Sequence, residues 1–322
     1  MKKLITITIL SLIYTLFIPS PALAQSFDMS ISPPLLTATV KPGKSFTKAF
    51  NIKNNSSSPV TLTARIIPFT PSDQMGHPQL LPQQTPHWLS YFQPINTDIK
   101  LNQPFTLKPQ QKEQIVLSVR IPSTAAFQDL YATLLLQSSS PDLPQGSSLS
   151  GSIGSNLLIS IANQPFPTTQ ISIQSLKPTT PPLLKIPSKN LYIYDSTTPL
   201  QIKATASNLG RHKTVVSGRL QLLKQDTPRQ VVPLLPVNLL AQSSRTLLAS
   251  SSGQPQLTIK PSLTRLGNHR LHLLLQSPQQ NLTTDITLFF LPFKAILAVI
   301  LLTTFSFVVI KKLQDNQPQA EK

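Results

Sequence analysis

The sequence predicts an all-β chain of two tandem antiparallel β-sandwiches, with one apolar segment before them and another after them. Apolar residues alternate with polar ones at period two in the region between the apolar segments, and turn-forming residues separate the alternating runs. That periodicity is typical of half-buried strands. The 32 prolines also favour many short strands and turns, because proline is excluded from helix interiors and central strands.

The N-terminal apolar segment has the features of a secretory signal peptide. Lys2 and Lys3 precede an apolar run over residues 4–18, and the small residues of Ala22-Leu23-Ala24 follow. A basic start, an apolar centre and a small-residue cleavage site are the three parts of such a signal. We therefore expect residues 1–24 to be removed and the mature chain to begin at Gln25.

The C-terminal apolar segment predicts a transmembrane helix over residues 292–310. Phe293 to Ile310 is apolar apart from Lys294 and a few hydroxyls, and a helix of that length spans about 27 Å, close to the ~30 Å hydrocarbon core. Lys311 and Lys312 follow at once, and basic residues favour the cytoplasmic side. The prediction is a single-pass protein of the cell membrane, extracellular up to the helix, with a short cytoplasmic tail over residues 311–322.

The region between the two apolar segments is long enough for two domains of ordinary size. Apolar residues take every second place in Val60–Ile66, Ile115–Ile121 and Leu200–Ala206. The stiff segment Asn163–Pro167 separates the last strand of one alternating set from the first of the next. We expect a first sandwich over residues 25–163 and a second over residues 164–291.

Two polar segments lack the strand pattern. Thr70–Pro86 is rich in proline, and Ser138–Ser150 is rich in serine, proline and glycine. Both are predicted to be long surface loops, which in compact domains are often functional.

The predicted exterior is strongly basic. Gln25 to Pro292 contains 22 Lys and Arg against 9 Asp and Glu, a net charge of +13. Such a charge favours anionic wall polymers, phospholipid head groups or acidic partners. The basic residues are spread along the chain in runs no longer than two, which favours a solubilising role. The sequence has no basic stripe interleaved with aromatic residues, so it does not predict nucleic-acid binding.

No pattern in the chain predicts an enzyme, a cofactor or a metal site. It has no cysteine and only two glutamates, Glu113 and Glu321. His269 and His272 would lie on opposite faces of a strand, which disfavours a shared metal, and solvated histidines near a turn are the preferred interpretation. Trp88, the only tryptophan, can anchor a partner or fill the core; we favour the core. We predict no catalytic, cofactor-binding or metal-binding residues.

The order of turns and strands in the first predicted domain resembles that of a known family. Lys41-Pro42-Gly43-Lys44 leads into a strand, Asn54–Pro59 leads into the next, and Ile121-Pro122 precedes Ala125–Ala132 and a further strand. This arrangement resembles the immunoglobulin-like domains of WxL-interacting proteins and, more distantly, those of pilus chaperones. The resemblance implies a membrane-anchored bacterial surface protein with two immunoglobulin-like domains, one linked to peptidoglycan and the other to partner proteins. It implies no individual binding residue.

Together these features favour a membrane-anchored binding or scaffolding protein of a bacterial envelope. The expected partner is a cell-surface or secreted protein, bound by surface complementarity or by strand addition to a free sheet edge; an anionic cell-wall polymer is the other candidate. The alternative function is a membrane-tethered assembly factor, similar to a pilus chaperone, that releases secreted subunits. Fold alone does not decide between these.

Overall fold

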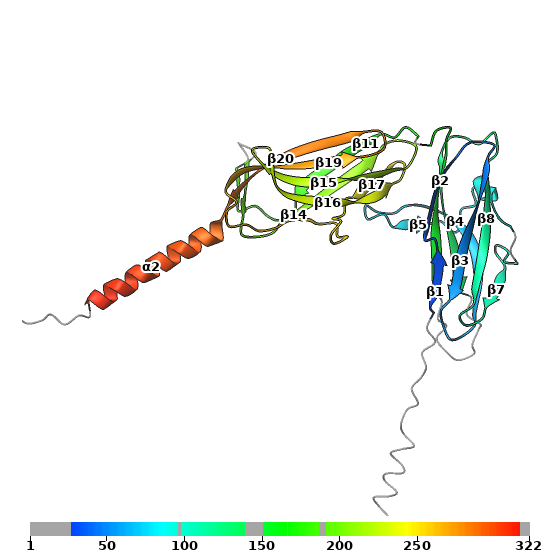
Figure 1. Ribbon diagram of the computed structural model, residues 1–322, viewed down its shortest axis with the longest axis horizontal. Helices are drawn as coiled ribbons and strands as arrows, with labels where there is room; N and C mark the ends of the chain where they lie inside the picture. Colours follow the sequence, from blue (N-terminus) through cyan, green and yellow to red (C-terminus); the bar gives the residue numbers. More distant parts are fainter. Residues whose placement is uncertain (1–26, 96–97, 139–150, 166, 187–190, 316–322) are drawn as a thin grey trace, which may run out of the picture.

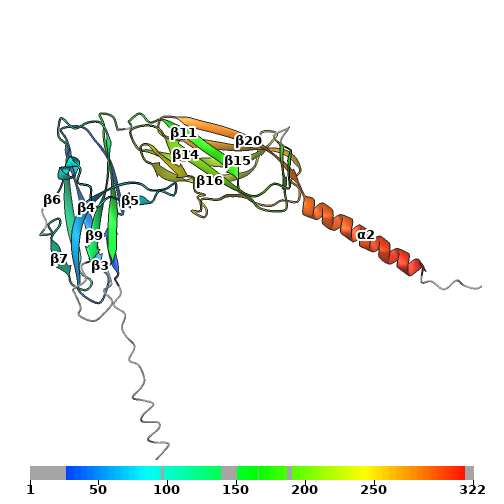
Figure 2. The same ribbon diagram turned by 180° about the vertical axis from the view of Figure 1, so that it is seen from behind.

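The computed structural model describes residues 27–95, 98–138, 151–165, 167–186 and 191–315. Figure 1 shows two β-sandwiches joined at an angle, followed by one helix that leaves the far end of the second sandwich. The view from behind in Figure 2 shows the same arrangement. The all-β, two-sandwich prediction is confirmed. The predicted signal peptide and most of the predicted loop Ser138–Ser150 lie outside the described residues.

The first sandwich packs two sheets face to face. One has the strand order β1-β3-β8-β6; the other has the order β2-β10-β9-β4-β5, with β7 also paired to β4. The strands are β1 (Met29–Ser32), β2 (Leu35–Val40), β3 (Ser45–Asn54), β4 (Val60–Pro71), β5 (Pro78–Leu80), β6 (Phe92–Ile95), β7 (Pro104–Leu107), β8 (Lys112–Arg120), β9 (Asp129–Ser138) and β10 (Ser152–Ile161), with the 3-10 helix η1 (His87–Tyr91).

The alternation in the sequence places the core of the first sandwich correctly. On β8 and just after it, Ile115, Leu117, Val119 and Ile121 are all buried. On β4, Leu62 and Ala64 are fully buried, as the alternation from Val60 predicts. Trp88 in η1 is half-buried: it packs against this core from outside and lies edge-on to Phe92, with ring centroids 6.1 Å apart, rather than filling the core as predicted.

The second sandwich has its own core, drawn from residues between Ile171 and Phe290. Its sheets have the orders β11-β14-β17, with β18 also on β14, and β12-β13-β20-β19-β15-β16. The strands are β11 (Ile171–Pro178), β12 (Leu184–Ile186), β13 (Leu191–Asp195), β14 (Leu200–Asn208), β15 (Thr214–Lys224), β16 (Thr227–Leu239), β17 (Ser243–Thr246), β18 (Leu257–Ile259), β19 (Gly267–Gln276) and β20 (Asn281–Leu291).

The helix α2 (Phe293–Asp315) follows β20 with only Pro292 between them. The Pro292 carbonyl accepts the first helical hydrogen bond, from the Ile296 amide at 3.0 Å, which fits the preference of proline for a helix start. Among the described residues α2 is the one helix long and apolar enough to cross a membrane. It continues past the predicted end at Ile310, so Lys311 and Lys312 are helical.

The predicted surface loop Thr70–Pro86 is partly wrong. β4 continues to Pro71, and Pro78–Leu80 returns as β5 in an antiparallel hairpin. The prolines at positions 68, 71 and 78 hid the strand pattern. β5 lies at the end of its sheet, where a strand tolerates proline because one side of its backbone needs no partner.

Candidate binding site at the junction of the two sandwiches

The outer face of one sheet in the first sandwich is unexpectedly apolar. Ile67, Phe69 and Leu158 are 4%, 6% and 4% exposed, yet they lie outside the core cluster. Each alternates with core residues along its strand, such as Ala64 on β4 and Leu157 on β10. They therefore lie on the opposite face, where Phe69 and Leu158 line a cleft together with Leu240 of the second sandwich.

A buried carboxylate on this face ties the two sandwiches together. The Asp129 side chain is 2% exposed, and its Oδ1 lies 2.9 Å from Nδ1 of His212. Its Oδ2 accepts hydrogen bonds from the Tyr131 hydroxyl, at 2.6 Å, and from the Lys213 amide. The Tyr131 oxygen in turn accepts a hydrogen bond from the Ala241 amide at 2.9 Å. Asp129 and Tyr131 thus fix two separate loops of the second sandwich.

The same network shifts the protonation equilibria of its members. Burial, followed by the charge and hydrogen bond of Asp129, raises the pKa of Tyr131, so the phenol stays protonated. Burial lowers the pKa of Lys213, and the nearby Asp129 opposes that shift. A buried carboxylate with this many donors is the arrangement expected of a fixed structural joint.

The β4–β5 hairpin forms a second link between the sandwiches. Oδ1 of Asp73 accepts hydrogen bonds from the Met75, Gly76 and His77 amides at 2.8–3.2 Å, and its Oδ2 lies 2.7 Å from Nδ1 of His77. These bonds, chiefly that from the His77 side chain, lower the pKa of Asp73 to about 2. The Gln74 carbonyl then accepts a hydrogen bond from the Thr246 amide of β17 at 2.6 Å.

Glycine is required at the tip of this hairpin. Gly76 has φ +86°, and a Cβ there would lie 2.4 Å from Cζ of Arg245. The guanidinium of Arg245 therefore packs directly on the hairpin backbone. A side chain at position 76 would both strain the backbone and displace Arg245.

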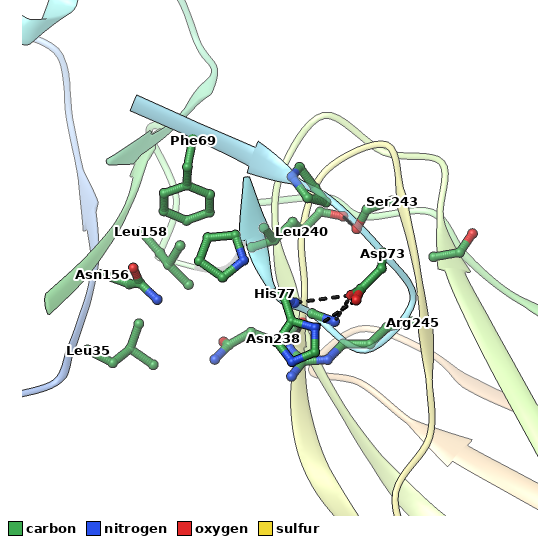
Figure 3. A pocket seen from close by; sticks show the side chains of 14 residues that line it. Leu35, Phe69, Asp73, His77, Asn156, Leu158, Asn238, Leu240, Ser243 and Arg245 are labelled. Atoms are coloured by element: carbon green, nitrogen blue, oxygen red, sulfur yellow. Dashed lines mark hydrogen bonds and ion pairs between the residues drawn. The ribbon is translucent and has the colours of Figure 1, made fainter. Parts of the chain in front are cut away.

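A cleft of about 200 Å³ opens between the hairpin, β10 and the second sandwich. Figure 3 shows Phe69, Leu158 and Leu35 on one side of the cleft, with Asp73 and Arg245 on the other. It combines an apolar wall with a polar one, a composition typical of sites that bind part of another molecule.

Arg245 is the most distinctive group in the cleft. Its Nη1 donates to the Asn238 carbonyl at 2.8 Å, whereas its Nε is buried with no hydrogen-bond partner among the described residues. Burial lowers the pKa of Arg245, and nearby Asp73 opposes that shift. The Arg245 side chain lines the cleft, and its positive charge is suited to a carboxylate from a partner.

A free sheet edge runs past this cleft. β2 is the end strand of its sheet and pairs with β10 alone, in parallel. The carbonyls of Pro34 and Val40 accept hydrogen bonds from the Asn156 and Ala162 amides of the β10 segment. Along a strand, the backbone N–H and C=O groups of successive residues point alternately to its two sides. The groups of Leu35, Thr37 and Thr39 therefore point away from β10, toward the open edge.

A second hollow, of about 240 Å³, lies along the other end of the same strand. It is lined by Thr37, Ala38 and Thr39 together with the interdomain linker and Val215 of the second sandwich. Leu35, at the start of β2, lines the first cleft on the side opposite Arg245. The free edge of β2 therefore connects two hollows, and both are formed by residues from the two sandwiches.

The structure disperses the five histidines over both sandwiches. Within the described ranges no group of three or more His, Asp or Glu residues is placed to hold an ion. His77 and His212 pair with Asp73 and Asp129, and the ring of His87 meets Tyr91. His272 lies 2.6 Å from Asp285.

His269 corrects the prediction of solvated histidines. It lies on the inner face of β19, 4% exposed, with its ring edge-on to Phe290 at 5.3 Å. Burial lowers its pKa, and the charges of Lys224, Arg265 and Arg229 add to that effect. The ring therefore fills the core in its neutral form, as the buried face of a strand requires.

We expect the second sandwich to lose stability as the pH falls below about 6.5, the ordinary histidine pKa. The unfolded chain binds a proton at position 269 before the folded chain does, so acid favours unfolding. His269→Gln should flatten this dependence. Hydrogen exchange of the β19 and β20 amides at pH 7 and about pH 5 measures it; the same acid sensitivity in both proteins would contradict the assignment.

Comparisons with known proteins give a likeness of shape alone. No family model matches the chain, and no curated protein matches it. Among solved structures, the class 5 fimbriae chaperone CfaA aligns with 80% of this chain and 98% of its own, at 11% identity and a TM-score of 0.39. The Escherichia coli chaperone DraB aligns with 81% and 98%, at 11% identity and 0.35.

A third solved structure is the CsuC–CsuE chaperone–tip adhesion subunit pre-assembly complex of Acinetobacter baumannii. It matches 82% of this chain and 99% of its own, at 9% identity and a TM-score of 0.37. Values this low carry no argument about function, and none of these matches bears on WxL-interacting proteins.

Proposed function

We propose that this chain is a membrane-anchored binding protein of a bacterial envelope, whose two sandwiches hold a protein partner outside the membrane. The single observation that carries the proposal is the free edge of β2, which connects two hollows at the interdomain junction. An extended segment of a partner can pair with this edge through its backbone, while its side chains enter the hollows.

The junction gives the edge a fixed setting. The Asp129 network and the hairpin contact to Thr246 hold the two walls of the cleft in place. A preformed site loses less entropy on binding than a mobile one. Arg245 lies across the cleft from Leu35, so the bound segment is expected to direct an acidic group into the cleft from the start of β2.

α2 supplies the anchor in this proposal. Its length and apolar composition suit a membrane span, and Lys311 and Lys312 favour a cytoplasmic end. The sandwiches then lie outside the membrane. The same site would serve a membrane-tethered assembly factor; such a factor releases its client, whereas a scaffold is found in a lasting complex.

The free edge can be tested by a proline substitution. The Thr37 N–H points away from β10, so Thr37→Pro removes a donor that the sheet does not use, as edge strands tolerate. We expect a roughly tenfold or greater loss of partner affinity, because the partner loses a hydrogen bond and leaves a carbonyl unpaired. Affinity is measured with the protein captured from envelope extract and then purified.

Thr37→Ala is the matched control, because it keeps the N–H and removes the same side chain. It should bind like the natural protein, and binding should survive raised salt, because backbone bonds and apolar burial carry it. Equal affinity of Thr37→Pro and Thr37→Ala would overturn the edge as the binding site. Binding that disappears in salt would instead favour an anionic wall polymer.

A further inference from the structure

We propose that the end of the second sandwich next to α2 docks on the surface of an anionic phospholipid bilayer. The inference rests on the proposed insertion of α2 in a membrane. It concerns the loop over residues 260–266, the segment over residues 179–184 and the turn at Gln225–Asp226, which together form what we call the membrane-facing end.

The connection to α2 leaves this end little freedom to leave the bilayer. β20 stops at Leu291 and α2 starts at Phe293. The Leu291 carbonyl accepts a hydrogen bond from the Ser196 amide at 3.0 Å, and the Ser196 carbonyl accepts one from the Ser262 amide at 2.7 Å. The loop over residues 260–266 is thus tied through Ser196 to the last residue before the helix. Figure 1 shows α2 leaving from this end of the sandwich.

Large apolar side chains are exposed at this end. Leu263 is 68% exposed, Leu266 is 52%, and Leu183 and Leu184 are 46% and 53%. Single exposed leucines are ordinary, but a group beside a membrane helix fits insertion into the headgroup boundary. A hollow of about 230 Å³ extends this surface to the helix, because Leu183 and Leu200 line it together with Lys294 of the first helical turn.

The charges around these leucines complement an anionic lipid surface. Exposed cations at this end include Lys260, Arg229, Arg270 and Lys294. The exposed acid Asp226 pairs with Arg270, and Asp195 is buried and accepts hydrogen bonds from Thr197. The exposed charge is therefore positive, and basic residues near a membrane are attracted by anionic headgroups. Exposed leucines and exposed cations at the same end of the sandwich match a lipid surface better than a purely acidic protein.

The test uses the absence of natural cysteine. Leu263→Cys and Leu209→Cys, each in the full chain, carry an environment-sensitive fluorophore after reconstitution in vesicles. Leu209 is 53% exposed but lies at the end of β14 far from α2, so it serves as the control. Vesicles contain phosphatidylcholine with or without phosphatidylglycerol, and a quencher is attached to the lipid near the headgroup.

We expect quenching at position 263 to exceed that at 209 by about threefold or more in vesicles with phosphatidylglycerol. Arg229→Gln combined with Lys260→Gln should reduce it to the value in pure phosphatidylcholine. Equal quenching at both positions, in a chain that resists alkaline extraction, would overturn docking while leaving the anchor intact. Alkaline extraction of the chain would instead overturn the anchor. A change in the fluorescence at position 263 that appears only after envelope proteins are added, and not with lipid alone, would also overturn lipid docking.

Discussion

Leu62→Asp is expected to unfold the first sandwich. Leu62 is fully buried on β4, opposite Phe105 of β7 and Ser138 of β9. A carboxylate there would lie in the core without a partner, at a cost of several kcal/mol. That cost is comparable to the whole stability of a domain, about 5–15 kcal/mol. Fluorescence of Trp88, the only tryptophan, reports on this core during denaturant unfolding.

Thr61→Asp is the matched control on the same strand. The Thr61 side chain lies away from the core, and its hydroxyl lies 2.9 Å from that of Thr106. An aspartate oxygen can accept a hydrogen bond from the Thr106 hydroxyl, so the change in unfolding free energy should stay within about 1 kcal/mol. Equal destabilisation by the two substitutions would mean that the register of β4 is wrong.

Asp129→Ala is expected to loosen the junction while both sandwiches remain folded. It removes the acceptor for His212, the Lys213 amide and the Tyr131 hydroxyl. Each buried donor left unpaired costs about 1–3 kcal/mol, which falls mainly on the contact between the sandwiches. Without that contact the linker alone would join them, and interdomain motion becomes the default.

Spin labels on introduced cysteines measure this loosening. Thr47 on β3 and Val231 on β16 are exposed positions, one in each sandwich. The distance distribution between them should be narrow in the natural chain and clearly broader in Asp129→Ala. Asp226→Ala is the control, because that carboxylate is 81% exposed and pairs only with Arg270 in the ion pairs of the described residues. Unchanged distributions in Asp129→Ala would show that other contacts hold the junction.

The sequence predicted the strands and cores well because a half-buried strand carries its own signal. The alternation at Ile115–Ile121 and Leu200–Ala206 corresponds to buried faces of β8 and β14. The same logic failed for β5, where Pro71 and Pro78 interrupt the alternation. One useful signal was missed: Ile66-Ile67 places apolar residues on both faces of β4, which indicates that the outer face is also covered.

The candidate site could not be predicted because its parts are distant in sequence. Asp129 and His212 are 83 residues apart, and Arg245 meets a hairpin that itself looked like a loop. No local sequence pattern predicts these contacts, because they depend on how the two folded sandwiches are placed relative to each other. His269 was misjudged for a related reason: its neighbours on β19 predicted a strand, but the polar ring concealed that position 269 belongs to the inner face.

The most direct test of the proposed function is site-specific photo-crosslinking in intact cells. A photoreactive amino acid replaces Thr37 on the free edge of β2, and the same group at Thr47 on β3 is the control, since both positions are exposed. The proposal predicts a protein adduct from position 37, absent at 47, that forms equally at raised salt. Two findings together would contradict it. Position 37 would give no adduct, and the only binding detected would be retention on purified wall material that is lost at raised salt.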